Sequence, residues 1–149
     1  MEKISIEVVK SSFSFFVPIQ VRFSDIDGYL HVNNGIYFNY FEHARAEYLH
    51  KVCDWDIMAI GTVVANVNID FFTPIHVHDS PSVYIKCTRI GNTSFTLEQV
   101  ILGKNPKGED KIFAKASTIM VAVDMKTMKP MPLPEEYASK MKNRSSVAG

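Results

Sequence analysis

The longest regular pattern of hydrophobic and polar positions in the chain runs from about Asn34 to Lys51. Its hydrophobic positions recur at the spacing of one helical face, at Tyr37, Phe41, Ala44 and Tyr48. The charged side chains of Glu42, Arg45 and Glu47 are expected on the other side. Asn33 or Asn34 can cap the first turn, because Asn side chains accept hydrogen bonds from the unpaired N–H groups there. The pattern predicts one long amphipathic helix.

Most other periodic segments are typical of β-strands. They lie at about residues 15–23, 63–72, 83–88, 95–101 and 111–124. In the second segment, Val63, Ala65, Val67 and Ile69 are expected on one face. Turn signals at Gly91-Asn92 and at 105–108 join later segments as hairpins. A strand, a long helix and four further strands predict an α+β fold, with an antiparallel β-sheet wrapped around one central helix.

One domain over residues 1–149 is expected, because this length suits a single hydrophobic core and no linker interrupts it. The core is expected at about residues 13–125. Three prolines within residues 130–134 lie in a C-terminal tail, residues 126–149, that either docks on the domain or is partly disordered.

Composition excludes several classes of function. Equal numbers of basic and acidic side chains give zero formal net charge, which disfavours a nucleic-acid-binding protein. No apolar run is long enough to span a membrane and no signal peptide is recognisable, so a cytoplasmic protein without membrane contact is expected. Cys53 and Cys87 lack zinc-motif spacing, and His76 and His78 have no third ligand nearby, so neither a metal nor a cofactor is expected.

The densest polar cluster is DIDGYLHVNNG, residues 25–35, between a predicted strand and the long helix. Two interpretations are open. The segment can be a structural turn, closed by Asp side chains, with Gly28 supplying a positive φ. It can also be a catalytic loop, because a carboxylate close to the unpaired N–H groups of a helix start supplies what acyl transfer from a thioester needs. A thiolate leaves readily, so a Ser-His-Asp triad is not required.

The segment VRFSDIDGYLHVNNGIYFNYFEHARAEYL resembles the N-terminal block of the 4-hydroxybenzoyl-CoA thioesterase-like family of hotdog-fold acyl-thioester hydrolases. Two later segments, VNIDFFTPIHVHDS and RIGNTSFTLEQ, are similar to further blocks of that family. The resemblance covers about residues 15–125 and implies the hotdog fold. It therefore favours the catalytic interpretation of the polar loop.

The resemblance also implies roles for single residues. Asp27, and not Asp25, matches the catalytic carboxylate, which acts as a nucleophile or as a general base. The backbone N–H of Asn34 matches the group that polarises the thioester carbonyl. His31, a supporting catalytic candidate, and Asn33, a substrate-binding candidate, belong to a His-Val-Asn-Asn element. That element is similar to one in acyl carrier protein (ACP) thioesterases, although Tyr29 stands where those enzymes have Asn. Tyr37, Phe71 and Phe72 are candidates for lining the acyl pocket.

The expected substrate is an acyl-CoA thioester, with an acyl-ACP as the alternative. Residues expected to bind the carrier are Arg89, Thr93 and Ser94. The resemblance implies a homodimer or homotetramer with an active site shared between subunits. The leading hypothesis is an acyl-CoA thioesterase, and the alternatives are an acyl-ACP thioesterase and a hotdog protein that binds an acyl thioester without turnover.

Overall fold

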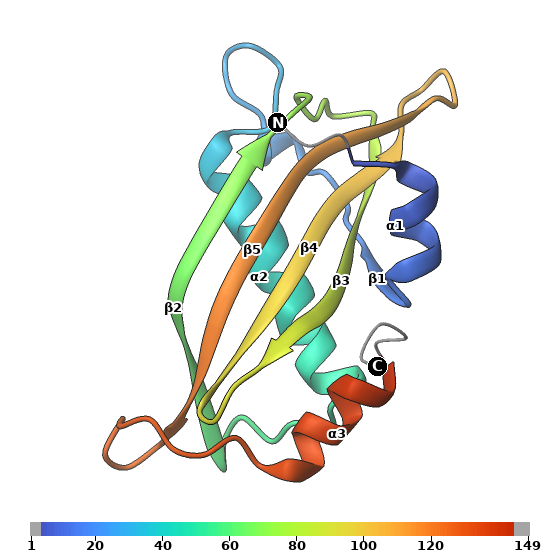
Figure 1. Ribbon diagram of the computed structural model, residues 1–149. Coiled ribbons are helices and arrows are strands. Elements are labelled where there is room, and N and C mark those ends of the chain that lie inside the picture. The colour runs from blue at the N-terminus through green and yellow to red at the C-terminus, as the bar shows by residue number, and fades with distance from the viewer. Residues whose placement is uncertain (1–3, 145–149) are drawn as a thin grey trace.

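The computed structural model describes residues 4–144, which form a five-stranded antiparallel sheet with a long helix across one face (Figure 1). The strands are β1 (Phe15–Pro18), β2 (Ile60–Phe71), β3 (Ser80–Ile90), β4 (Ser94–Lys104) and β5 (Asp110–Asp124). The helices are α1 (Ile6–Ser12), the 3₁₀ turn η1 (Phe23–Asp25), α2 (Asn34–Lys51) and α3 (Glu135–Arg144). The strand order is β1-β3-β4-β5-β2, which confirms the predicted α+β layout.

Helix α2 has the bounds that the sequence pattern predicts. Its N-cap is Asn33, whose side chain accepts a hydrogen bond from the Gly35 N–H at 2.9 Å. The face turned to the sheet is made of the buried side chains Tyr37, Tyr40, Phe41, Ala44, Tyr48 and Leu49. Their burial holds the helix on the sheet, since a helix in water gains most of its stability from such packing.

Arg45 was expected on the solvent side of α2, and this prediction is wrong because its side chain is buried. Its Nη1 donates to the Gln99 Oε1 at 3.3 Å, and the Gln99 Nε2 donates to the Phe41 carbonyl at 2.9 Å. The long aliphatic stem of an arginine lets it cover apolar surface in this way. The contact joins α2 to the middle of β4 through a polar network within the core.

Two strands also differ from their predicted form. The first ends at Pro18 and not at residue 23, because a proline has no N–H for a sheet ladder. In β2 the register shifts between Val64 and Asn66, so Ala65 is the extra residue of a bulge. Val64 therefore shares the α2 side of the sheet with Val67 and Ile69, which Val63 does not, against the expected alternation.

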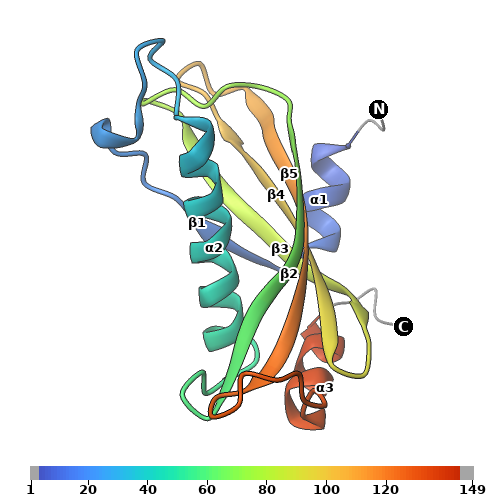
Figure 2. The same cartoon turned by 90° about the vertical axis from the view of Figure 1, so that its left-hand side faces the viewer.

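The face of the sheet turned away from α2 carries α1, whereas α3 lies at one end of the molecule and packs on residues of the α2 side (Figure 2). Val9 and Phe13, in α1 and just after it, pack on Val100 and Leu102 of β4. Near one end of the sheet, Tyr137 of α3 stacks on Trp55, with ring centroids 4.3 Å apart. The part of the C-terminal tail that forms α3 thus docks on the domain, and residues 145–149 lie outside the described residues.

Strand β2 lies at an edge of the sheet and pairs with β5 alone among residues 4–144. It contains no Lys, Arg or Pro, and Asp70 is its single charged residue. Val63, Val64 and Phe71 on it are exposed. Proteins usually protect an edge strand with short length, charge, proline or a bulge, and β2 has only Asp70 and the bulge at Ala65.

Both cysteines are predicted to be inert in the folded protein. Burial raises the pKa of the Cys53 thiol to about 12 and that of Cys87 to about 11, so the reactive thiolate is scarce at neutral pH. A thiol reagent should therefore react slowly with native protein and should find two thiols after denaturation. Rapid labelling of either cysteine in native protein would contradict this, and slow labelling leaves assays of released thiol free of background.

Candidate active site

Asp25 anchors the loop that precedes α2. Its side chain is 2% exposed, and its Oδ2 accepts the Tyr40 hydroxyl at 2.6 Å and the Arg22 N–H at 3.0 Å. The Arg22 guanidinium lies 3.5 Å from its other oxygen. Burial together with the bond to Asp25 raises the pKa of Tyr40 well above its usual value, so this hydroxyl stays protonated. Asp25 is fully engaged within the fold and does not line the cleft beside it.

Asp27 holds the loop differently and keeps one oxygen open. Its Oδ1 accepts the N–H groups of Tyr29 at 2.9 Å and His31 at 3.3 Å, which closes an Asx turn. The left-handed residue of the turn is Leu30, with φ of 65°, and not Gly28 as expected. Among the described residues no partner is found for Oδ2. The turn and the catalytic loop are thus compatible, since one oxygen shapes the backbone and the other stays available.

The start of α2 presents an open hydrogen-bond donor. The side chain of Asn33 accepts the N–H of Gly35, and the carbonyl of Asn33 accepts the N–H of Ile36 at 2.9 Å. The Asn34 N–H has no acceptor within residues 4–144. This donor sits at the positive end of the helix dipole, where a negative charge on a bound group is stabilised.

A cleft of about 440 Å³ brings these groups together. Its lining residues are Asp27, Tyr29, His31, Val32, Asn34, Tyr37, Phe71, Phe72, Thr73 and Pro74. They come from three places: the loop before α2, the first turn of α2, and the end of β2 with the residues that follow it. Asn33 caps the helix beside the cleft, and the predicted site residues that line this one cleft are Asp27, His31, Asn34, Tyr37, Phe71 and Phe72.

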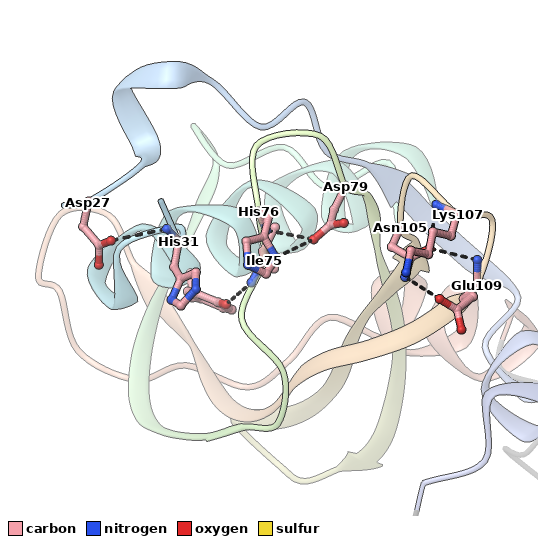
Figure 3. Close-up of polar contacts among 9 residues, drawn as sticks. Asp27, His31, Ile75, His76, Asp79, Asn105, Lys107 and Glu109 are labelled. Carbon is pink, nitrogen blue, oxygen red and sulfur yellow. Dashed lines mark hydrogen bonds and ion pairs between the residues drawn. The ribbon is translucent and has the colours of Figure 1, made fainter. Parts of the chain in front are cut away.

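A second loop, residues 72–79, lies beside the loop that precedes α2, with His76 next to His31 (Figure 3). The Ile75 N–H donates to the Tyr37 hydroxyl at 3.1 Å, and the Ile75 carbonyl accepts the Val32 N–H at 2.8 Å. The His76 ring meets the His31 ring edge to face, with centroids 4.7 Å apart. Asp79 in turn accepts the His76 N–H at 2.8 Å. Sequence reasoning assigned no role at the site to His76 or Asp79, and no local pattern indicates that their loop meets the one before α2.

The three predicted carrier-binding residues lie elsewhere. Arg89, Thr93 and Ser94 are at or beside the turn between β3 and β4, at the end of the sheet where β2 begins. Strand β2 finishes at the opposite end of the sheet (Figure 1), and its last residue, Phe71, lines the cleft. Because β2 has 12 residues, its two ends are roughly 36 Å apart. Within one chain the structure does not bring these residues to Asp27.

The family follows from comparison with known sequences. The family model of the Thioesterase-like superfamily matches residues 21–141, which is most of the chain. The protein belongs to the Thioesterase-like superfamily. The thioesterase family and the hotdog fold expected from the sequence are thereby confirmed, and the protein is a thioester hydrolase.

Relatives of this thioesterase agree with that assignment. The long-chain acyl-CoA thioesterase FadM of Escherichia coli strain K12 is 32% identical over 126 residues, covering 83% of this chain and 93% of FadM. A thioesterase from Thermus thermophilus, whose structure is a complex with coenzyme A and Zn, is 30% identical with a TM-score of 0.75, covering 90% of this chain and 96% of that one. A structure of 4-hydroxybenzoyl-CoA thioesterase, at 17% identity and a TM-score of 0.78 over 85% and 97% of the two chains, shares the fold.

Two features are absent from the described part of this thioesterase. Within residues 4–144, no group of three or more His, Cys, Asp or Glu side chains is arranged to hold a metal ion. No helix in the same part of the chain is both long enough and apolar enough to cross a membrane.

Proposed function

We propose that this thioesterase hydrolyses acyl-CoA at the cleft described above, with Asp27 as the catalytic carboxylate and the Asn34 N–H as the oxyanion donor. The observation that carries the proposal is that the open Oδ2 of Asp27 and the open Asn34 N–H belong to residues lining one cleft. In this arrangement the thioester carbonyl oxygen lies against the first turn of α2, and its carbon lies within reach of Asp27.

Two routes are compatible with these groups. In the first, Asp27 Oδ2 attacks the carbonyl carbon, the C–S bond breaks, and the thiolate leaves behind a mixed anhydride that water then hydrolyses to the free acid and the carboxylate. In the second, Asp27 takes a proton from water while the water oxygen attacks, and that proton goes to the departing thiolate. In both routes the Asn34 N–H stabilises the negative charge on the carbonyl oxygen. His31 and Asn33 hold the backbone around these groups.

Coenzyme A is the carrier that the comparisons favour. FadM is a long-chain acyl-CoA thioesterase, and the T. thermophilus relative is in complex with coenzyme A. The open carboxylate of Asp27 argues against a protein that only binds thioesters, because binding does not need it. The two free, buried cysteines suit the reducing cytoplasm.

The proposal includes a second copy of the chain, because β2 offers an unpaired edge. Two β2 strands that pair antiparallel about a two-fold axis place the Phe71 end of one copy beside the Ile60 end of the other. Arg89, Thr93 and Ser94 of the partner subunit then approach Asp27, where Arg89 can pair with the phosphates of coenzyme A. A dimer built in this way completes a site that one chain leaves open.

Exposed apolar side chains support the same arrangement. Tyr29 and Phe71 line the cleft and Phe23 and Leu30 lie in the segment before α2, whereas Ile57, Met58, Met125 and Met128 lie close to the start of β2. The antiparallel pairing of two β2 strands brings the first group of one copy against the second group of the other. Apolar patches of this kind on a soluble protein usually mark an interface.

Thiol release from a panel of acyl-CoAs and acyl-ACPs tests the proposed activity. Turnover of acyl-CoA is expected, with acyl-ACP the poorer substrate. No release from any thioester would contradict the proposed function, and a preference for acyl-ACP would contradict the carrier.

A lysine at position 63 is predicted to separate the dimer. Val63 lies on the β2 edge strand, and Val63→Lys places a charge where apolar strands are expected to meet. Sedimentation should show a dimer or tetramer for the wild type and a smaller species for the variant, with thiol release lost alongside. Phe16→Lys, on the opposite edge strand β1, is the matched control and should retain activity. A wild-type monomer with full activity would contradict the shared site.

A further inference from the structure

A second hollow, of about 670 Å³, lies between α2 and the beginning of β2. Its apolar lining is Leu49, Trp55, Ile57, Val64, Met120, Val123, Met125 and Met128, and the charged residues at it include Glu42, Arg45 and Glu47. We propose that this α2–β2 groove holds the acyl chain of a linear aliphatic thioester whose carbonyl is bound at Asp27 of the partner subunit. The inference rests on the proposed function and names the class of acyl group that the enzyme takes.

The cleft beside Asp27 cannot hold a long acyl chain on its own. Its floor is closed by the buried side chains of Val32, Tyr37 and Ile75, and the Tyr37 hydroxyl is bonded to the Ile75 N–H. Beneath them Phe41 and Phe113 belong to the same closely packed core. Close packing of this kind leaves no channel for an alkyl chain. An acyl group longer than the cleft must therefore continue along the surface of the protein.

The two-fold arrangement determines where an acyl chain that leaves the cleft continues. Both hollows lie on the α2 side of the sheet: the cleft at the first turn of α2, and the groove beside its second half, from Glu42 to His50. Antiparallel pairing of β2 strands runs the helix of one copy opposite to that of the other. The groove of one subunit then opens toward the cleft of its partner. An acyl chain that leaves the cleft passes from one subunit into the other.

The lining of the groove suits an alkyl chain. Met120, Met125 and Met128 have unbranched, flexible side chains that adapt to apolar ligands of varied shape. The eight-residue advance from Glu42 to His50 along α2 gives the groove a length of about 12 Å. An apolar lining that extends over about 12 Å favours an extended chain over a compact aromatic acyl group, which the Asp27 cleft could take without the groove.

Filling the groove tests the inference. Val64 points into it from β2 and is 46% exposed, so Val64→Trp narrows the groove without opening the core. We expect kcat/KM for palmitoyl-CoA to fall roughly tenfold or more while kcat/KM for butanoyl-CoA is retained. Ile119→Trp, exposed on the opposite face of the sheet, is the matched control and should leave both values unchanged.

The outcomes separate this inference from the proposed function. If wild-type enzyme turns over no thioester, the proposed function fails. If it turns over acyl-CoAs but prefers benzoyl-CoA, or if Val64→Trp spares palmitoyl-CoA or lowers both substrates equally, the groove assignment is overturned and the hydrolase stands. Sedimentation of Val64→Trp establishes that its dimer is intact.

Mixed dimers test which subunit supplies the groove. A dimer with Asp27→Asn in one chain and Val64→Trp in the other keeps one complete site if the groove acts on the partner, so about half of the palmitoyl-CoA activity should remain. With both substitutions in one chain and a wild-type partner, no complete site remains for palmitoyl-CoA, while butanoyl-CoA is still hydrolysed at one site. If the first mixed dimer instead loses its palmitoyl-CoA activity and the second keeps about half of it, the groove serves its own subunit and its assignment to the partner is overturned.

Discussion

Replacing Asp27 with Asn is expected to lower kcat for acyl-CoA hydrolysis by about 10²–10⁴ and to leave the fold intact. The amide oxygen of the substituted side chain can still accept the N–H groups of Tyr29 and His31, so the Asx turn is kept. The open oxygen, however, is replaced by an NH₂ group that can neither attack a carbonyl nor accept a proton from water. Thiol release measured at saturating acyl-CoA, with circular dichroism as the check on folding, gives the result.

Asp25→Asn is the matched control two residues away. Asp25 is buried and bonded to Tyr40 and Arg22, so its replacement is expected to cost about 1–3 kcal/mol of stability while folded enzyme keeps its kcat. Replacing Asp27 should therefore lower kcat without lowering stability, whereas replacing Asp25 should lower stability without lowering kcat. Full activity of Asp27→Asn, together with loss of activity in folded Asp25→Asn, would reverse the assignment.

The largest effect on stability is expected from Phe41→Ala, which should lower the free energy of unfolding by about 3–5 kcal/mol. Phe41 is fully buried where α2 meets the sheet, and its carbonyl also accepts the Gln99 side chain. Truncation to alanine leaves a cavity that the surrounding strands cannot fill. Urea denaturation followed by circular dichroism, at one fixed protein concentration, measures the loss.

Phe38→Ala on the same helix serves as the control for Phe41. Phe38 is 49% exposed, so the same change of side chain should alter stability by no more than about 0.5 kcal/mol. If both variants lose similar stability, the loss arises from helix α2 itself and not from packing against the sheet.

The helix was the most predictable part of the fold, because an 18-residue pattern with a cap at Asn33 leaves few alternatives. The strands were less predictable in detail. Neither the bulge at Ala65 nor the early end of β1 at Pro18 follows from alternation, since both depend on how neighbouring strands pair. Arg45 was misplaced because a charged side chain can lie within the core when a buried amide such as Gln99 accepts its hydrogen bond.

The candidate site was predictable where it is local in sequence. Asp27 and Asn34 stand in one motif, so the resemblance could place them together, and they line one cleft. His76 and Asp79 lie on a separate loop, and nothing in the sequence says that this loop meets His31. The distance of Arg89 from Asp27 within one chain follows from strand length and order, which become visible only in the folded sheet.

Trp55 gives the molecule a built-in optical reporter. It is the single tryptophan of the chain, 4% exposed, with its indole N–H donated to the Ile60 carbonyl at 2.8 Å. One side of the ring stacks on Tyr137 of α3, and the residue also lines the α2–β2 groove. The tryptophan fluorescence of the native protein therefore comes from one place, where the C-terminal helix and the groove meet. Undocking of α3 or entry of an alkyl chain can be followed by emission alone, without a label.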